Sequence, residues 1–239
     1  MDKKYILGLQ EISWIMKYDN NEKEYVKEEI RREFQLERMI LFSDAVFAIV
    51  ITLMAIEIHI PDSVRFNSAE ELRLELVHLL PSVIAYTASF GFIGYTWYQH
   101  LQLFSLLKDY DKGIVFRNLL MLFFIGFFPF SASLIARPNH GIFLVALIYF
   151  AVIILAKSAQ LALQYYILMK RPQLRINTDI HDEVIRFRKS RLAITMLAVM
   201  FLLTAFTLFL VKDAQEKPFA WSWFILFPIL RRVLQKRIK

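Results

Sequence analysis

An apolar stretch near the start of the chain carries side chains that are costly to place in lipid. It runs from Arg38 to Pro61 with the sequence RMILFSDAVFAIVITLMAIEIHIP. It begins with R-x-x-x-F-S-D, which ends at Asp44, and it carries Thr52 near its middle and Glu57 toward its far end. Ionisable groups in such a segment indicate a functional site or a polar contact between helices.

As an α-helix, this stretch is long enough to cross a bilayer core of about 30 Å, and it has two distinct faces. At about 100° per residue, Thr52, Leu53 and Ile56 fall within about 60° of Ile49. They form a line of aliphatic side chains with one hydroxyl group. Asp44 points roughly 140° away from this line.

Periodicity alone favours a structural interpretation of each face. The aliphatic line would contact lipid or a neighbouring helix, as in any membrane helix. The hydroxyl of Thr52 would bond back to its own helix. Asp44 would bond to a polar group of another helix, for which His100 and Asn118 are candidates, while Arg38 would pair with Asp44 or with lipid phosphates.

The composition predicts an all-α polytopic membrane protein. Among 239 residues, 57% are hydrophobic, 22 are Phe and none is Cys. Long unbroken apolar runs exclude a transmembrane β-barrel, and the missing cysteines exclude thiolate metal sites and disulfides. Five histidines without clustered metal-ligand spacing predict neither a metal site nor an enzyme. We attribute the net charge of +7 to membrane topology and expect no nucleic-acid partner.

Six transmembrane helices are predicted within residues 38–230. The extension 1–37 before them is polar and amphipathic, and the tail 231–239 is basic. The last span is short and contains Pro228. The predicted spans are 39–60, 79–101, 114–136, 141–169, 192–211 and 219–230.

The distribution of Lys and Arg predicts the orientation of these spans. The two termini and the alternate links on their side hold 23 of the 29 basic residues, and the links on the opposite side hold five. Because basic residues concentrate on the cytoplasmic side, both termini are expected in the cytoplasm. We predict a multi-pass protein of the plasma membrane whose first span runs outward.

Four motifs in order resemble the transmembrane-protein-175 family of potassium channels. They are FSDAVFAIVITLMAIEI after Arg38, WYQH at 97–100, RNLL with Asn118, and FFPFSASLI from Phe127. The resemblance covers about residues 38–136. It implies one six-helix channel domain per chain, assembled as a homotetramer of the bacterial type. It also implies a pore lined by the first helix of each subunit, without the T-V-G-Y-G filter of other potassium channels.

The resemblance also implies roles for individual residues. Ile49, Leu53 and Ile56 would form the pore constriction and gate, and Thr52 would form a layer that favours potassium over sodium. Independently of the resemblance, the charge of Glu57 would concentrate cations at the outer mouth, with a solvated acidic loop as the alternative. The potassium ion would bind only transiently, with no cofactor or resident metal. The structural motif network would comprise Arg38, Phe42, Ser43, Asp44, Trp97, His100 and Asn118.

These features favour a potassium-permeable cation channel with a hydrophobic gate. One alternative is a secondary transporter that uses the polar stripe of Lys157, Gln160 and Gln164, although we expect Lys157 to reach toward the cytoplasmic interface. A proton-leak channel, which animal members of the family suggest, is a further alternative.

Overall fold

In the computed structural model, residues 3–56, 58, 68–136, 142–176, 179–210 and 232 are described. Every regular element among them is helical, as predicted, and five helical segments are long and apolar enough to cross a membrane. The predicted sixth span, Glu57 and nearly all of the basic tail lie outside the described residues. The elements are α1 (Lys3–Ile56), α2 (Ala69–His78), α3 (Leu80–Phe104), α4 (Lys112–Ile125), α5 (Phe128–Ala136), α6 (Ile142–Tyr165), the π-helical turn η1 (Tyr166–Lys170), the 3-10 turn η2 (Pro172–Leu174) and α7 (His181–Leu210).

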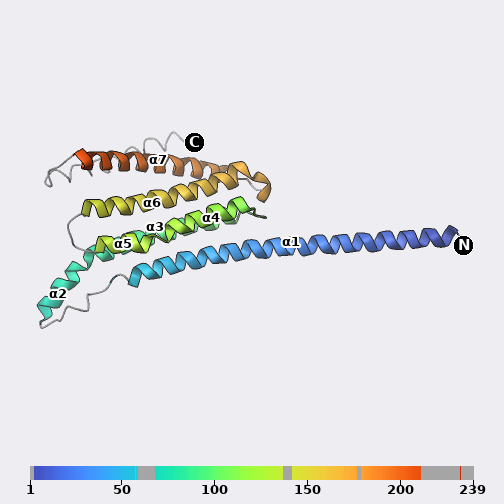
Figure 1. The fold of residues 1–239 in the computed structure, drawn as a ribbon, viewed down its shortest axis with the longest axis horizontal. Helices are drawn as coiled ribbons and strands as arrows, with labels where there is room; N and C mark the ends of the chain where they lie inside the picture. The colour runs from blue at the N-terminus through green and yellow to red at the C-terminus, as the bar shows by residue number, and fades with distance from the viewer. Residues whose placement is uncertain are drawn as a thin grey trace.

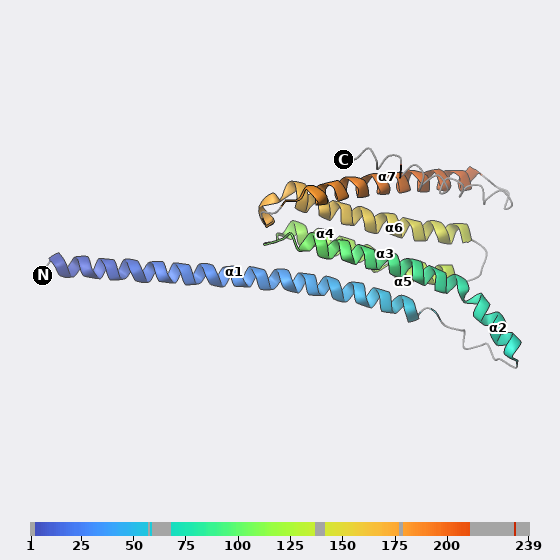
Figure 2. The ribbon, with the colours of Figure 1, turned by 180° about the vertical axis from the view of Figure 1, so that it is seen from behind.

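The helix α1 runs for 54 residues, about 80 Å, without interruption. Its N-terminal half projects far beyond the other helices (Figures 1 and 2). The segment contains no proline, which would break the backbone ladder, and pairs such as Glu28 and Arg32, 3.7 Å apart, support its charged part. The predicted boundary at residue 37 falls inside this helix, so the extension and the first span share one helical register.

The remaining helices pack in layers beside the C-terminal half of α1. This half contacts α3, α4 and α5, and α6 lies between those helices and α7 (Figure 1). One face of α1 enters the core through Phe47, Val50 and Met54, which are each less than 5% exposed. The first span is therefore held by its buried face, and its opposite face is exposed among the described residues.

The predicted third span, 114–136, consists of two helices and not one. α4 ends at Ile125 and α5 begins at Phe128, with a turn between them. Pro129 explains the break, because proline has no N–H for the ladder and its ring clashes with the carbonyl of Ile125 four residues earlier. At the second position of α5 the missing N–H costs nothing. The two helices together remain long enough to cross a membrane.

The links contain two helical parts that the predicted spans did not include. α2 occupies the link before α3 and is capped by Ser68, whose hydroxyl accepts the N–H of Glu71 at 3.2 Å. α7 begins at His181, eleven residues before the predicted span, and absorbs the amphipathic part of the preceding link. Both parts are short polar sequences whose helical state depends on the longer apolar helix that follows.

The link between α3 and α4 is tied to the end of α6 by Asp111. The carboxylate accepts the hydroxyl of Tyr166 at 2.7 Å, lies 3.3 Å from the guanidinium of Arg171, and caps α4 through the N–H of Ile114. Burial raises the pKa of Asp111, but these hydrogen bonds and Arg171 outweigh it and leave the pKa below its ordinary value. A Cβ atom at Gly113 would clash with the hydroxyl end of the Tyr166 side chain, so a larger residue here would displace that ring.

Candidate functional site

The residues predicted to line a pore lie on the face of α1 that points away from the rest of the chain. Ile49, Leu53 and Ile56 are 55%, 46% and 70% exposed. On the opposite face, Ser43 and Phe47 are at most 2% exposed. These three aliphatic side chains therefore share one open surface, and α1 presents it to lipid or to another molecule.

Thr52 lies on the same open face. Its hydroxyl oxygen is 2.9 Å from the carbonyl of Ile49 and 3.1 Å from that of Ala48, so it donates its proton to its own helix. This confirms the predicted back-bonding. Because the proton points into the backbone, the lone pairs of the hydroxyl oxygen face outward.

A buried polar chain joins α1 to α4 and α3. The amide nitrogen of Asn118 donates to the hydroxyl oxygen of Ser43 at 2.8 Å, and that hydroxyl donates to the carbonyl of Met39 at 2.9 Å. Nε2 of His100 donates to the amide oxygen of Asn118 at 2.9 Å. The imidazole stacks on Phe104, with ring centroids 4.0 Å apart. These linked hydrogen bonds fix the rotation of α1 about its own axis.

Asp44 is bonded separately from this chain. Its carboxylate accepts the indole N–H of Trp97 at 2.8 Å, so its partner is the tryptophan rather than His100 or Asn118. Both side chains are partly exposed. The Asp44 contact ties α1 to α3 at the rim of the interface, beside the buried chain.

Two members of the predicted network lie outside it. The guanidinium of Arg38 lies 6.0 Å from the ring centre of Phe34 on its own helix, and no polar contact joins it to Asp44 among the described residues. Phe42 is 53% exposed. Helix geometry places Phe42 about 20° from Ile49, on the open face.

Sequence reasoning missed one polar contact inside the membrane-crossing part. Nζ of Lys157 donates to the side-chain oxygens of Gln99 at 3.0 Å and Gln160 at 2.8 Å. It also lies 5.0 Å from the ring centre of Phe92. Lys157 is therefore engaged between α6 and α3 and does not reach for the interface as expected. Gln99, which precedes His100, was the residue in the sequence that could have indicated a buried partner for Lys157.

The projecting half of α1 forms one wall of an acidic groove of about 850 Å³. The links around Asp109 and Leu174 form the other wall. On α1 the groove is lined by Glu29, Glu33 and, from the same side, Arg32. Among the residues that the structure describes, no group of three or more His, Cys, Asp or Glu is arranged to hold a metal ion.

Comparison with known proteins places these features in context. The family described as "Endosomal/lysosomal potassium channel TMEM175" matches residues 38–129. A potassium channel of Chamaesiphon minutus is 37% identical over 100 residues, which cover 42% of this chain and 49% of the relative. One of Streptomyces collinus is 32% identical over 133 residues, which cover 54% of this chain and 63% of the relative. The chain thus spans about half to two thirds of the length of these relatives.

A solved structure shares the fold over most of the chain. It is the crystal structure of a lysosomal potassium-selective channel TMEM175 homolog from Chamaesiphon minutus, with a TM-score of 0.61 and 24% identity. The alignment covers 85% of this chain and 99% of that one. The matched region contains the open face of α1 and the polar residues behind it, so the chain is similar to the TMEM175 family in this region and shares the fold of a solved homologue.

Proposed function

We propose that four copies of this chain form a potassium-permeable cation channel lined by α1. The observation that carries the proposal is the aliphatic face of α1 left open within the chain, opposite its buried face. A continuous apolar surface on a helix held from behind is suited to surround an axis shared with other copies. The names of the bacterial relatives as potassium channels support this function.

The constriction would consist of rings of Ile49, Leu53 and Ile56. Four copies of such side chains around an axis leave a narrow, dry neck, and an apolar neck that sheds its water blocks ions without a charged gate. A small rotation or outward tilt of the four helices would widen and wet the neck. Ion flow is thereby coupled to the position of α1.

Thr52 would supply the selectivity layer between these rings. Its hydroxyl proton is held by the backbone, so four oxygen atoms present lone pairs toward a passing ion. Potassium gives up hydration water more readily than sodium does. A ring of weak oxygen ligands therefore favours potassium, but only modestly.

The buried polar chain would set which residues face the axis. Ser43 and Asn118 fix one side of α1 against α4, and the contact of Asp44 with Trp97 fixes it against α3. A rotation of α1 by one residue, about 100°, would turn Ile49 away from the axis. The network thus acts on conduction through position and not through contact with the ion.

The proposal extends to parts of the chain that the structure does not describe. A sixth span at 219–230 would return the tail to the cytoplasm and place both termini there, in the plasma membrane. Glu57 would lie at the outer mouth and raise the local concentration of cations. The channel would need no cofactor and perform no covalent chemistry.

Two leucines of similar exposure test the assignment of the pore. Leu53 is 46% exposed on α1, and Leu202 is 64% exposed on α7. In purified protein reconstituted into bilayers under a potassium gradient, Leu53→Ala should raise single-channel conductance because it widens the neck. Leu202→Ala should leave conductance unchanged. Equal effects of both substitutions would contradict a pore lined by α1.

The same preparation separates the alternatives. A transporter lacks support because Lys157 and Gln160 are bonded to each other and to α3. Carrier activity would show turnover-limited flux without unitary currents. A reversal potential that follows an imposed pH gradient, and not the potassium gradient, would show that the permeating ion is the proton and would contradict potassium permeation.

A further inference from the structure

The register of α1 carries the open face of the membrane segment into the projecting half. Because the helix is continuous from Lys3 to Ile56, positions can be related across it at about 100° per residue. Arg38, Arg31 and Lys27 fall about 20°, 0° and 40° from the direction of Ile49. The direction of α1 that is aliphatic at Ile49 therefore carries basic side chains from Arg38 back to Lys27.

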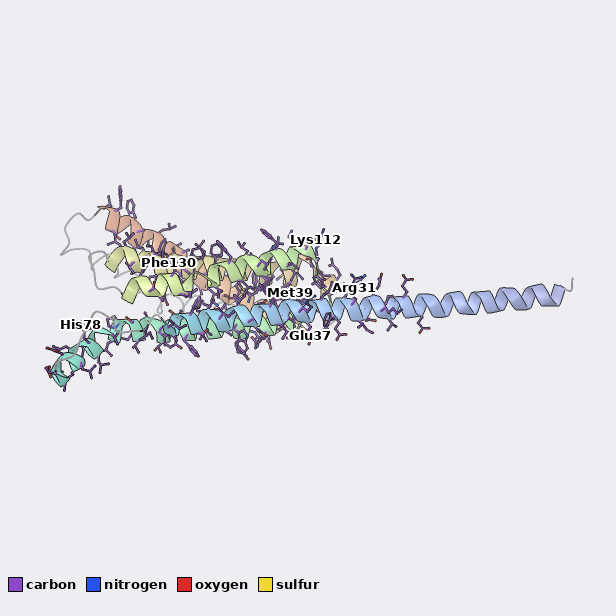
Figure 3. All side chains as sticks on the ribbon, turned by 60° about the horizontal axis from the view of Figure 1, so that its bottom comes forward. Arg31, Glu37, Met39, His78, Lys112 and Phe130 are labelled. Carbon is purple, nitrogen blue, oxygen red and sulfur yellow. The ribbon has the colours of Figure 1, made fainter. Side chains whose placement is uncertain are left out.

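These three cations are exposed. Lys27 and Arg31 take part in no hydrogen bond or ion pair within the described part of the chain, and the contact of Arg38 is with the ring of Phe34. Glu24 and Glu28 lie about 20° and 60° from the same direction, which leaves a net charge of about plus one per chain. Figure 3 shows Arg31 where α1 leaves the bundle, near the end marked by Lys112.

The other side of the same segment has the opposite character. Glu29 and Glu33 line the acidic groove, and Arg32 lies 3.5 Å from Asp109 and 3.7 Å from Glu28. The basic residue on the groove side is therefore matched by carboxylates. Within the part of the chain that the structure describes, Lys27 and Arg31 on the open face have no such carboxylate partner.

We propose that Lys27, Arg31 and Arg38 of four copies line the cytoplasmic entrance of the pore and bind a free, phosphate-rich anion there. The proposal rests on the proposed function, because it takes α1 as the helix around the axis. Arg31 would lie about 27 Å from Ile49 along the helix, and Lys27 about 33 Å. The anion belongs to the class of triphosphates and short polyphosphates, which guanidinium and ammonium groups bind through charge-assisted hydrogen bonds.

Such a ring has two effects on potassium. When empty, it repels cations and lowers their concentration at the cytoplasmic mouth, so outward current is smaller than inward current. When occupied, a polyphosphate neutralises the ring and restores outward current. It also relieves repulsion between the four helices, whose basic faces point toward each other. Cytoplasmic phosphate compounds would thereby regulate outward potassium flux.

Single-channel recording of the full-length chain in zwitterionic bilayers tests the electrostatic effect. At low ionic strength, wild-type current should be smaller by about twofold or more when potassium enters from the N-terminal side. The double variant Lys27→Gln with Arg31→Gln should make the current symmetric. Tripolyphosphate on that side should do the same for the wild type. The matched control Arg32→Gln, one residue further on the groove side, should keep the asymmetry.

Calorimetric titration of tripolyphosphate into the detergent-solubilised protein gives a readout that needs no current. Wild type and Arg32→Gln should bind it, and the double variant should bind about tenfold more weakly. Absence of current with this binding pattern would refute the channel proposal but keep the anion site. Current without this pattern would refute the anion site alone.

Two further results would overturn the assignment of the ring to the pore entrance. One is a symmetric wild-type current at low ionic strength. The other is a wild-type current that becomes symmetric with anionic lipid in the bilayer and not with free tripolyphosphate. In that case the three residues would face lipid headgroups and not an aqueous entrance.

Discussion

Both faces of α1 within the membrane segment carry large apolar side chains, but in different surroundings. Phe47 on one face is 2% exposed, and Phe42, five residues earlier on the other face, is 53% exposed. The buried face packs against side chains of the neighbouring helices, and the hydrogen bonds among Ser43, Asn118 and His100 connect it to them. Within the described part of the chain, the open face is exposed at Ile49, Leu53 and Ile56. The comparison teaches that one helix can be anchored on one side and leave the other side available for the conduction proposed above.

The largest expected effect tests whether the buried face carries stability. Phe47→Ala removes a side chain from the core and should lower the free energy of unfolding by about 3–5 kcal/mol. Phe42→Ala removes the same atoms from the open face and should change it by less than about 0.5 kcal/mol. Unfolding titrations of both variants in mixed detergent micelles measure the difference. Similar losses for the two would abolish the distinction between the faces.

The polar chain behind α1 should give the next largest effect. Asn118→Leu removes the bonds to Ser43 and His100; Ser43 keeps its bond to the carbonyl of Met39, but Nε2 of His100 is left buried without a partner. We expect a loss of about 1–3 kcal/mol, since an unpaired buried polar group costs more than the bond itself. Thermal unfolding monitored by circular dichroism measures it. An unchanged melting temperature would mean that the hydrogen bonds through Asn118 do not hold the rotation of α1.

The contacts of Asp111, which lie away from α1, supply a reference for the stability effects expected on the two faces of α1. The pKa of Asp111 is lowered in the folded protein, so its contribution to stability is present above the unfolded pKa of about 3.9 and is lost as pH falls through the folded value. Wild type should therefore lose stability on acidification below about pH 4. Asp111→Asn should be less stable at neutral pH and should show a weaker acid dependence.

Unfolding titrations at pH 7 and at pH 3 check this expectation. The accompanying variant Gly113→Ala should destabilise the protein at both pH values, because its Cβ atom meets the hydroxyl of Tyr166. An acid dependence of the same size in wild type and Asp111→Asn would assign it to other carboxylates.

The sequence allowed the two faces to be predicted because a single helix obeys one local rule. A rotation of about 100° per residue separates Ile49 from Asp44 without knowledge of the rest of the fold. The motif pattern was a weaker guide. It grouped Arg38 and Phe42 with Ser43 because they are near in sequence, although the same rotation places Phe42 on the open face.

Contacts between distant segments could not be predicted in the same way. Lys157 meets Gln99, 58 residues away, and only the packing of α6 on α3 decides that its amine is bonded there. The break after α4 depends on whether Pro129 bends a span or ends it, and packing also decides this. Residues inside one helix follow from periodicity, whereas partners across helices require the fold.

The smallest expected effect is the sharpest test of the open face. Thr52→Val keeps the shape of the side chain and removes the hydroxyl oxygen, so stability should change little because the residue is exposed and its bond is to its own helix. If Thr52 faces the ion path, four lost oxygen ligands should lower the preference for potassium over sodium by a few fold, less than about 1 kcal/mol per ion. Reversal potentials under opposed potassium and sodium gradients measure this preference.

Thr207 on α7 gives the matched control for that substitution. It is a half-buried threonine whose hydroxyl is likewise bonded to its own helix, at 2.7 Å from the carbonyl of Leu203. Thr207→Val should leave the reversal potential unchanged. If Thr52→Val also leaves it unchanged while Leu53→Ala raises conductance, the open face would form the gate without forming the selectivity layer. Conduction and selectivity would then have separate origins in the proposed channel.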